Sequence, residues 1–480
     1  MGHLNMDELR KKAIHIGNVT EEYVVEIEDI TSEEGVALFS WTHREDEELG
    51  IWIELAADGR LIRLSKDINS SNHGSSIYHE KELKDKALDF VEKHYPRVNE
   101  IFTLEEWGNN GQETYKLVYV QIELDLPLPL TGFSITIALS GEITYFRYDG
   151  TAENIDIPES ILSKEEIRIE CINGLEMKLL ISEISKNLYV EGDDQLHLVY
   201  EPTLPFYSYS VDGIKDEFEY EEEEEPREYI ETIVRPSFRE QKTINELIGF
   251  DENEFEQIRE LDLGNVTGSV WRIKNNKVQV QEDKTIEGYF NKRNDNTLKI
   301  QRDNETGKIL GVFSFLEREG ELGLTKEESK EVALQLLFIL YPSADLYFRY
   351  VVIEEEDEED TEEESKNFRF EFRIFHEGID NRLASARVSV NRTTGFVDHY
   401  LAPDVDPEAL KNINTIPAVT AEEASNIFKN ELSLELKWNK EYKDNQESYY
   451  ALSYVISFPK LRGRIDFINA QTGEKIVNKL

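Results

Sequence analysis

Basic residues are scarce in this chain of 480 residues. Lys and Arg together number 53 against 99 Asp and Glu, which gives a formal net charge of −46 at pH 7. Proteins that bind nucleic acid by neutralising its phosphates need clustered Lys and Arg. The composition therefore argues against a nucleic-acid partner, and the mutual repulsion of so many carboxylates favours a monomer.

The chain has one cysteine and no long apolar run. The single cysteine, Cys171, cannot form a disulfide within the chain, and its apolar neighbours Ile169 and Ile172 indicate a small core residue. No run of about 18 apolar residues occurs, and the opening residues lack the apolar stretch of about 7 to 15 residues of a secretory signal. We therefore expect a cytoplasmic protein without membrane contact, with export as the alternative if a leader was removed from the sequence as given.

Motifs that mark an active site are also absent. The nine histidines form no His-Glu-x-x-His pair, and His79 and His94 lie too far apart to share an ion. Neither a Gly-x-Ser-x-Gly elbow nor a glycine-rich phosphate loop occurs. Leu-Pro-Leu-Thr-Gly at 128–132 has the letters of a sortase signal, but it lies in mid-chain and is expected to lead into a strand. We expect no catalytic residues, no cofactor and no metal.

Two alternatives use the abundant carboxylates. A pair of them in a cleft between two halves of the chain could supply the acid and the base of a hydrolase, provided that one is desolvated. The acidic run 354–364 could instead collect Ca²⁺, whose ligands are hard oxygens, although a solvated loop is the simpler interpretation.

Aromatic residues are plentiful. The 22 Tyr, 23 Phe and 5 Trp supply more apolar surface than a disordered polyanion would carry. The length is also about three times the roughly 150 residues expected for one domain. Several packed domains or a repeat are therefore expected.

A small polar residue followed by Gly recurs six times, each time between stretches of alternating apolar residues. The glycines are Gly59, Gly141, Gly213, Gly307, Gly395 and Gly473, and successive ones lie 72 to 94 residues apart. Gly tolerates the positive φ of a tight turn, and a period of two is that of strands with one buried face, so each position predicts a β-hairpin. The chain therefore divides into six units.

Helices are predicted ahead of these hairpins. Three segments have the spacing of a capping box, in which a hydroxyl residue stands three positions before a Glu: Ser163 to Glu166, Thr325 to Glu328, and Thr420 to Glu423. A helix from about Glu80 carries Leu83, Ala87 and Val91 at steps of four and stops before a Tyr-Pro pair, as does the helix after Thr325.

The six units form a larger duplication, because the first three glycines map onto the last three with offsets of 248, 254 and 260 residues. We predict an α+β fold of tandem modules, each a helix packed on an antiparallel β-sheet, in two duplicated halves. The first half is 1–230, with modules at about 6–72, 76–152 and 158–218, and the second is 240–480, with modules at about 240–318, 322–405 and 415–480. The linker is expected within 216–239, where the acidic run 221–225 cannot form a core.

A capped helix followed by strands that end in a Thr-Gly or Asp-Gly hairpin resembles the cystatin-like PepSY module. The tandem arrangement, with Tyr-Pro closing a helix and the strand 386–391 ahead of Thr394 and Gly395, is similar to the YcdB/YcdC-type repeat proteins of Gram-positive bacteria. The resemblance implies an association with the folding, inhibition or protection of peptidases, usually outside the cytoplasm, for PepSY modules, and no established activity for the YcdB/YcdC type.

The function predicted from the sequence is that of a non-catalytic protein-binding or scaffold protein, with modulation of a peptidase or an envelope protein as the role that the resemblance suggests. Exposed edge strands can accept an extended peptide as an additional strand. Phe206, Tyr207 and Tyr209 are the candidate contacts for a protein or peptide partner, because aromatic residues often dominate interfaces. Strand alternation would put Tyr207 and Tyr209 on one face, which is equally the pattern of a core strand.

Overall fold

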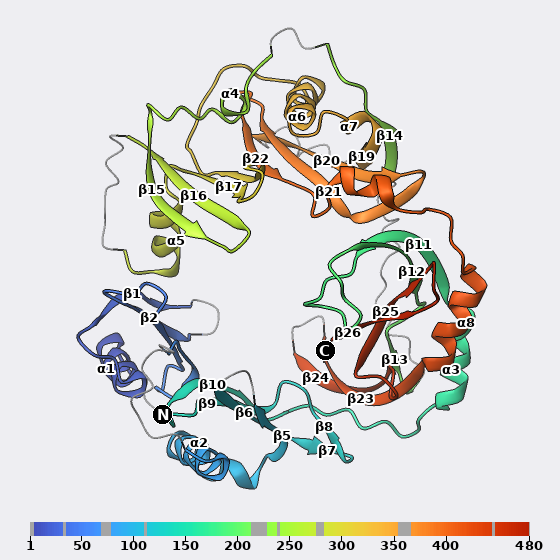
Figure 1. The fold of residues 1–480 in the computed structure, drawn as a ribbon. Coiled ribbons are helices and arrows are strands. Elements are labelled where there is room, and N and C mark those ends of the chain that lie inside the picture. Colours follow the sequence, from blue (N-terminus) through green and yellow to red (C-terminus); the bar gives the residue numbers. More distant parts are fainter. Residues whose placement is uncertain are drawn as a thin grey trace.

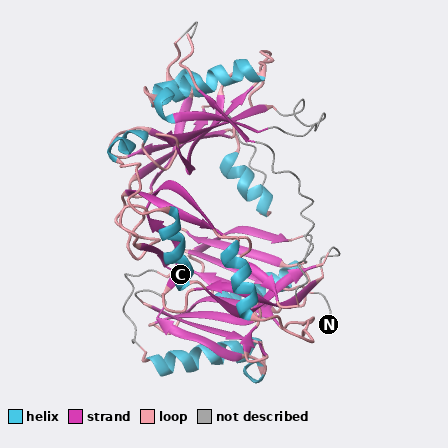
Figure 2. Cartoon of the chain, turned by 90° about the vertical axis from the view of Figure 1, so that its right-hand side faces the viewer, coloured by secondary structure: helices cyan, strands magenta, loops and turns pink. Residues whose placement is uncertain are grey.

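The computed structural model describes residues 4–31, 35–68, 78–109, 113–212, 228–237, 241–274, 283–353, 366–443 and 447–479. The chain forms a ring of three β-sheet assemblies, with helices α1, α2, α3, α6 and α8 on the outer side and the strands on the inner side (Figure 1). Figure 2 shows the ring from its side, with helices lying against the outer faces of the upper and lower sheets. Within the described ranges, no helix is long and apolar enough to cross a membrane.

The first assembly is an eight-stranded antiparallel sheet built from two meanders. The order is β1-β2-β3-β4-β10-β9-β6-β5, so the last strands of the two meanders pair with each other. The elements are α1 (Met6–Gly17), β1 (Tyr23–Ile30), β2 (Ala37–His43), β3 (Gly50–Leu55), β4 (Leu61–Lys66), α2 (Glu80–His94), a 3-10 turn (Val98–Glu100), β5 (Thr103–Asn109), β6 (Thr114–Val120), the small β7 (Ile122–Glu123) and β8 (Leu126–Pro127), β9 (Gly132–Ala138) and β10 (Ile143–Gly150). As predicted for the second helix, Leu83, Ala87 and Val91 form the buried stripe of α2.

The second assembly repeats this plan as a nine-stranded sheet. The order is β14-β19-β20-β21-β22-β18-β17-β16-β15, and the last strands of its two meanders, β18 and β22, pair as β4 and β10 do. The elements are β14 (Glu228–Thr232), α4 (Ile244–Ile248), β15 (Phe255–Asp262), β16 (Val266–Ile273), α5 (Ile286–Asn294), β17 (Thr297–Asp303), β18 (Ile309–Ser314), α6 (Lys326–Leu340), α7 (Ala344–Tyr347), β19 (Phe348–Ile353), β20 (Asn367–His376), β21 (Ile379–Asn391), β22 (Val397–Leu401) and a 3-10 turn (Pro407–Asn412). The α+β fold and the duplicated halves are confirmed.

Strand β14 lies inside the segment 216–239 that was expected to be a linker. Its five residues pair antiparallel with β19, and Tyr229 stands opposite Val352. The acidic run 221–225 lies outside the described residues. Extended residues after that run add an outer strand to the second sheet, because β19 otherwise presents an unpaired edge on this side.

The third assembly is formed jointly by the last module of each half. Sheet β11-β12-β25-β26 takes two strands from each half, and sheet β13-β24-β23 takes β13 from the first half and the other two strands from the second. The elements are α3 (Lys164–Asn173), β11 (Glu176–Glu183), β12 (Leu196–Thr203), β13 (Ser208–Ser210), α8 (Ala421–Glu431), β23 (Ser433–Tyr442), β24 (Ser448–Ser457), β25 (Gly463–Asn469) and β26 (Lys475–Lys479). Helix α8 packs on β11 and β12, and α3 packs on β23.

This exchange differs from the expectation that 158–218 and 415–480 are separate modules. Within the described residues the first module supplies a helix, the pair β11-β12 and the single strand β13, and the second module supplies a helix and the pairs β23-β24 and β25-β26. Each of the two sheets combines strands of both modules. Such an exchange preserves the contacts of an unexchanged module while linking the two copies. The halves are therefore interlocked at this point of the ring, on the right in Figure 1.

Capping boxes begin most of the helices. The boxes predicted at Thr325 and Thr420 are confirmed: each hydroxyl accepts from the Glu backbone N–H at 3.2 Å, and each Glu accepts from the Thr backbone N–H. Ser163 does begin α3, but its side chain makes no capping bond, so that prediction is wrong. Three further boxes, at Asn5, His79 and Thr243, start α1, α2 and α4.

The predicted glycine turns are confirmed wherever they are described. Gly59, Gly141, Gly307, Gly395 and Gly473 have φ between 68° and 82° and lie between paired strands, whereas Gly213 lies outside the described residues. In the second half a short side chain secures the turn: Asp303 accepts from the backbone N–H of Thr306 at 2.7 Å, and Asn391 and Asn469 play the same part in their own turns.

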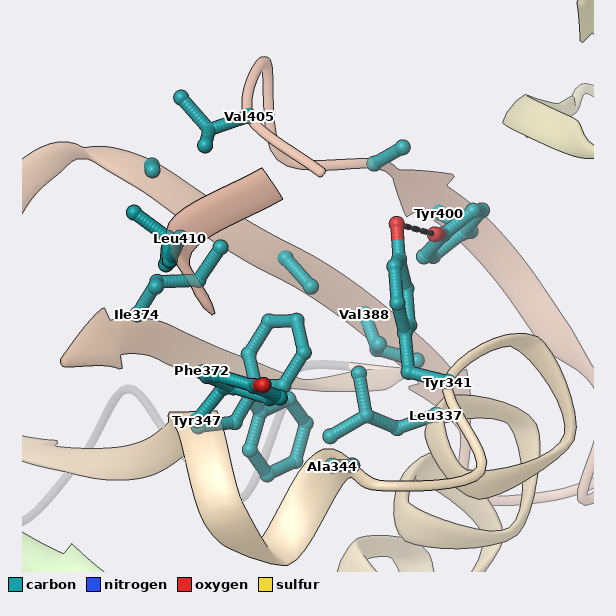
Figure 3. Packing of buried hydrophobic residues seen from close by; sticks show 14 of the residues in the cluster. Leu337, Tyr341, Ala344, Tyr347, Phe372, Ile374, Val388, Tyr400, Val405 and Leu410 are labelled. Carbon is teal, nitrogen blue, oxygen red and sulfur yellow. Dashed lines mark hydrogen bonds between the residues drawn. The ribbon is translucent and has the colours of Figure 1, made fainter. Parts of the chain in front are cut away.

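Buried aromatic and aliphatic residues fill the space between α6 and the second sheet. Figure 3 shows Leu337 and Tyr341 facing Phe372, Val388 and Tyr400, with the two tyrosine hydroxyls 3.4 Å apart. The cluster extends into the third assembly, where Cys171 is fully buried, as predicted. Burial raises the pKa of the Cys171 thiol to about 11, so this residue is an inert part of the core.

The ring closes where the first strand meets α5. The backbone N–H of Glu28 in β1 donates to Lys284 O at 2.8 Å, and the Asp29 carboxylate accepts from the backbone N–H of Ile286 at 3.0 Å. Asp29 thus caps the first turn of α5 across the boundary between the halves, where a negative charge is favourable. Arg259 and Glu47 add an exposed ion pair at 3.3 Å.

Replacing Asp29 by alanine is expected to loosen this closure. Loss of a cap costs about 1 kcal/mol, which corresponds to about fivefold faster opening. Hydrogen exchange followed by mass spectrometry should therefore accelerate in β1 and at the start of α5. The variant Glu21→Ala, in the turn before β1, serves as the control. Unchanged exchange in Asp29→Ala would show that other contacts close the ring.

Candidate binding site

Of the three aromatic residues singled out by sequence, one is exposed. Tyr207 is 60% exposed, whereas Phe206 and Tyr209 are half-buried and pack edge to face with their ring centroids 4.9 Å apart. Strand β13 begins at Ser208, and the backbone oxygen of Tyr207 still accepts from the N–H of Ile456 in β24 at 3.4 Å, but the Tyr207 ring is much more exposed than that of Tyr209. Phe206 and Tyr209 therefore belong to the core edge, and Tyr207 is left as a surface contact.

Tyr207 stands at a seam between the two halves. Strands β12 and β25 pair at Val199 with Asn469 and at Tyr200 with Ile468, and the pairing stops there. Both strands nevertheless continue, β12 to Thr203 and β25 back to Gly463. The described backbone of the two strands is thus joined at one end of the seam and open at the other.

A proline and a bulge keep the seam open. Leu198 O accepts from the backbone N–H of Ala470, so every second residue of β12 faces β25, and the second position after Tyr200 is Pro202. Proline has no N–H and cannot continue the ladder. The residue that would stand opposite it, Asp466, lies at the register shift in the pairing of β25 with β26.

A small pocket lies along this open seam. Its volume is about 140 Å³, and its lining comes from both halves: Glu201, Pro202, Leu204, Tyr207, Phe428, Ile456, Phe458, Arg464, Ile465, Asp466 and Phe467. Pockets for drug-sized ligands and cofactors usually measure about 300–1,000 Å³. This pocket therefore matches a single apolar side chain better than a cofactor.

Two of the charged groups at the pocket rim, Arg464 and Asp466, are already engaged with each other. The Arg464 Nε donates to Asp466 at 2.8 Å, and Asn478 donates to the second carboxylate oxygen at 2.7 Å. Burial, followed by the carboxylate of Asp466, raises the pKa of the nearby Tyr189 to about 12. Among the described lining residues Arg464 is the only cation, and its charge is matched within the seam.

Sequence reasoning identified Tyr207 but none of the other residues of this pocket. Pro202 carried a readable signal, since a proline inside a strand-like run marks an edge or an interruption of the ladder. Arg464, Ile465 and Phe467 carried none, because they become neighbours of β12 only through the exchange of strands.

A second, more polar pocket lies between the halves on the other side of the third assembly. It has a volume of about 280 Å³ and includes Asp149, Glu153, Lys440, Glu447 and Tyr450. Burial raises the pKa of Asp149, although the Arg147 guanidinium 2.7 Å away acts in the opposite direction. A desolvated carboxylate between the halves is the feature that a carboxylate-based hydrolase would need.

Among the described residues, no group of three or more His, Cys, Asp or Glu side chains is arranged so that it could hold a metal ion. The acidic run 354–364, the candidate for Ca²⁺, lies outside those residues.

Two duplicated halves, each with two helix-on-sheet meanders and a third module exchanged with the other half, define a protein of tandem α+β repeats. The profile of the "YcdB, YcdC repeated domain" matches residues 6–150 and 239–404, which hold the two large sheets with their helices except for the outer strand β14. The chain belongs to this YcdB/YcdC repeat family.

Relatives support the assignment over nearly the whole length. The chain is 38% identical over 472 residues to the uncharacterized protein YcdB of Bacillus subtilis (strain 168), covering 98% of this chain and 97% of the relative. It is 32% identical over 457 residues to the uncharacterized protein YcdC of the same organism, covering 94% and 96%. A solved structure, the Bacillus megaterium YpeB C-terminal domain, aligns with 13% identity and a TM-score of 0.27 over 43% of this chain and 90% of that one.

Proposed function

We propose that the protein is a non-catalytic binding module that holds an extended polypeptide segment at the open seam between β12 and β25. The single observation that carries the proposal is that the backbone ladder stops after Tyr200 and Ile468 while both strands continue. Pro202 interrupts the ladder on the β12 side, so a guest strand would pair with the free edge of β25 beyond Ile468, and pockets for alternate side chains would then supply specificity.

The pocket supplies the side-chain contact that the guest needs. Leu204, Ile456 and Phe458 offer an apolar lining, and the exposed ring of Tyr207 lies at its edge. An apolar side chain buried there would contribute about 1.5–3 kcal/mol, and Tyr207 would shield it from water. A peptidase or an envelope protein that bears such a segment is the kind of partner implied by the resemblance to PepSY modules.

Selection from a displayed library of random peptides on the immobilised full-length protein tests the proposal. The selected peptides are expected to bind Tyr207→Ala about tenfold more weakly than the unaltered protein, because an aromatic anchor contributes about 1.4 kcal/mol or more. Tyr442→Ala is the matched control, since Tyr442 is also 60% exposed but lies at the end of β23. Failure to select any peptide, or equal loss in both variants, would overturn the proposal.

The hydrolase alternative rests on Asp149 and predicts a different outcome. A protein that uses this pocket for hydrolysis would cleave some of the peptides presented to it, and mass spectrometry of the recovered peptides would reveal new ends. Asp149→Asn should abolish that cleavage while leaving binding at the seam unchanged. Intact peptides throughout would favour the non-catalytic function.

A further inference from the structure

If the protein binds an extended segment as proposed above, the surface around the seam also indicates which residue types that segment contains. We infer that the segment held at the seam is cationic, with Lys or Arg on either side of one bulky apolar residue. The apolar residue follows from the lining of the pocket, and the cationic flanks follow from the charge of the surface around it.

The first argument is the balance of charge on the whole chain. A formal charge of −46 creates a negative field that accelerates the approach of cations and opposes that of anions. The field also bears on a second copy of this chain as the occupant of the seam. A second copy carries the same charge, so at low salt its docking is opposed.

The second argument is local. The carboxylate of Glu201 lines the pocket itself. Further carboxylates lie close to two tyrosines of the third assembly: burial, and after it the carboxylate of Glu423, raises the pKa of Tyr200 in β12, and burial, and after it Glu170 on α3, raises the pKa of Tyr209. Negative charge is therefore present at the pocket and beside it.

The third argument is the state of the cation at the rim. Arg464 lines the pocket, but its Nε donates to Asp466 at 2.8 Å within the same strand. An acidic guest would have to share this guanidinium with Asp466, which already balances its charge, so the guest would gain less than from an unengaged cation. A basic guest leaves the pair intact and adds attraction to Glu201, which also lines the pocket.

Fluorescence anisotropy with three synthetic nine-residue peptides tests the inference. All three carry a central Leu between Val residues, and their flanks contain Lys, Ser or Glu. The Lys peptide is expected to bind the full-length protein at least tenfold more tightly than the Glu peptide at about 50 mM salt, and the difference should shrink several-fold at about 500 mM because charges are then screened. Equal affinities of the Lys and Glu peptides would overturn the inference.

Two controls separate this inference from the function on which it rests. If the Ser and Glu peptides bind as well as the Lys peptide and all three are weakened by Tyr207→Ala, the seam binds peptides but has no charge preference. If none of the three binds, the proposed function fails as well. A Lys peptide whose central Leu is replaced by Ser should lose most of its affinity. Undiminished binding of that peptide, or of the Lys peptide to Tyr207→Ala, would indicate attraction to the acidic surface elsewhere and would overturn the inference.

Discussion

Replacing Ile468 by aspartate is expected to separate the two halves of the protein while both large sheets stay folded. Ile468 is fully buried and pairs with Tyr200 at the last closed position of the seam. An aspartate there would be an ionised group without a partner in an apolar site, which costs about 4 kcal/mol or more. The exchanged assembly joins the halves through paired strands, and without it the ring is closed only by the short contact between β1 and α5, so its loss should let the halves move apart. The core of the first sheet is separate from the assembly, and the second sheet shares only part of its core with it.

Small-angle X-ray scattering and differential scanning calorimetry would measure this effect. The variant should show a larger radius of gyration and an additional transition at lower temperature than the unaltered protein. Ile468→Val is the control, since it removes one methyl group, costs about 1 kcal/mol and leaves the ring closed. A single transition for Ile468→Asp at an unchanged radius would mean that the exchange does not join the halves.

Gly132→Ala is expected to unfold the second meander of the first sheet. Gly132 begins β9 with φ of 80°, and an added Cβ would lie 1.9 Å from the backbone oxygen of Tyr119. The positive φ alone costs an alanine about 1 kcal/mol, and relief of the backbone clash requires β6 and β9 to move apart, so a total of about 3 kcal/mol or more is expected. Urea denaturation would measure the loss of stability.

Gly108→Ala provides the matched comparison within the same sheet. Gly108 lies in β5, and an added Cβ would meet no heavy atom within 4 Å. Alanine at this position should be neutral or stabilise the protein by up to about 1 kcal/mol, because it reduces the freedom of the unfolded chain. Similar losses in both variants would contradict the clash as the cause at Gly132.

Local signals made much of the architecture predictable. A positive-φ glycine such as Gly395 and a capping box such as that of Thr420 depend on a few neighbouring residues, and the structure reproduces both. The segment 128–132 leads into β9 as expected, with the Thr131 hydroxyl donating to Leu128 O at 2.7 Å. Repetition of these local signals was enough to reveal the duplicated halves.

The exchange of strands could not be predicted from the sequence, because it does not depend on signals between neighbouring residues. An alternating strand such as β12 can pair equally well with a strand of its own module or with one of the corresponding module in the other half, because both pairings bury the same face. The pocket depends on that choice: Phe428 and Ile465 reach Tyr207 only because β25 lies beside β12. Ser163 shows that local signals can also mislead, because it has the spacing of a capping box but its side chain makes no capping bond.

Interlocking of the last modules also sets the order in which a newly made chain can mature. Strands β11 and β12 leave the ribosome long before β25 and β26, which are the final strands of the sequence. Until β25 and β26 have been made, the first half carries a β-sheet with an open side, and contacts between such distant segments form slowly. Synthesis of β25 and β26 is thus the step that permits ring formation, and a nascent chain that stalls before β25 would expose an unpaired strand edge to chaperones and proteases.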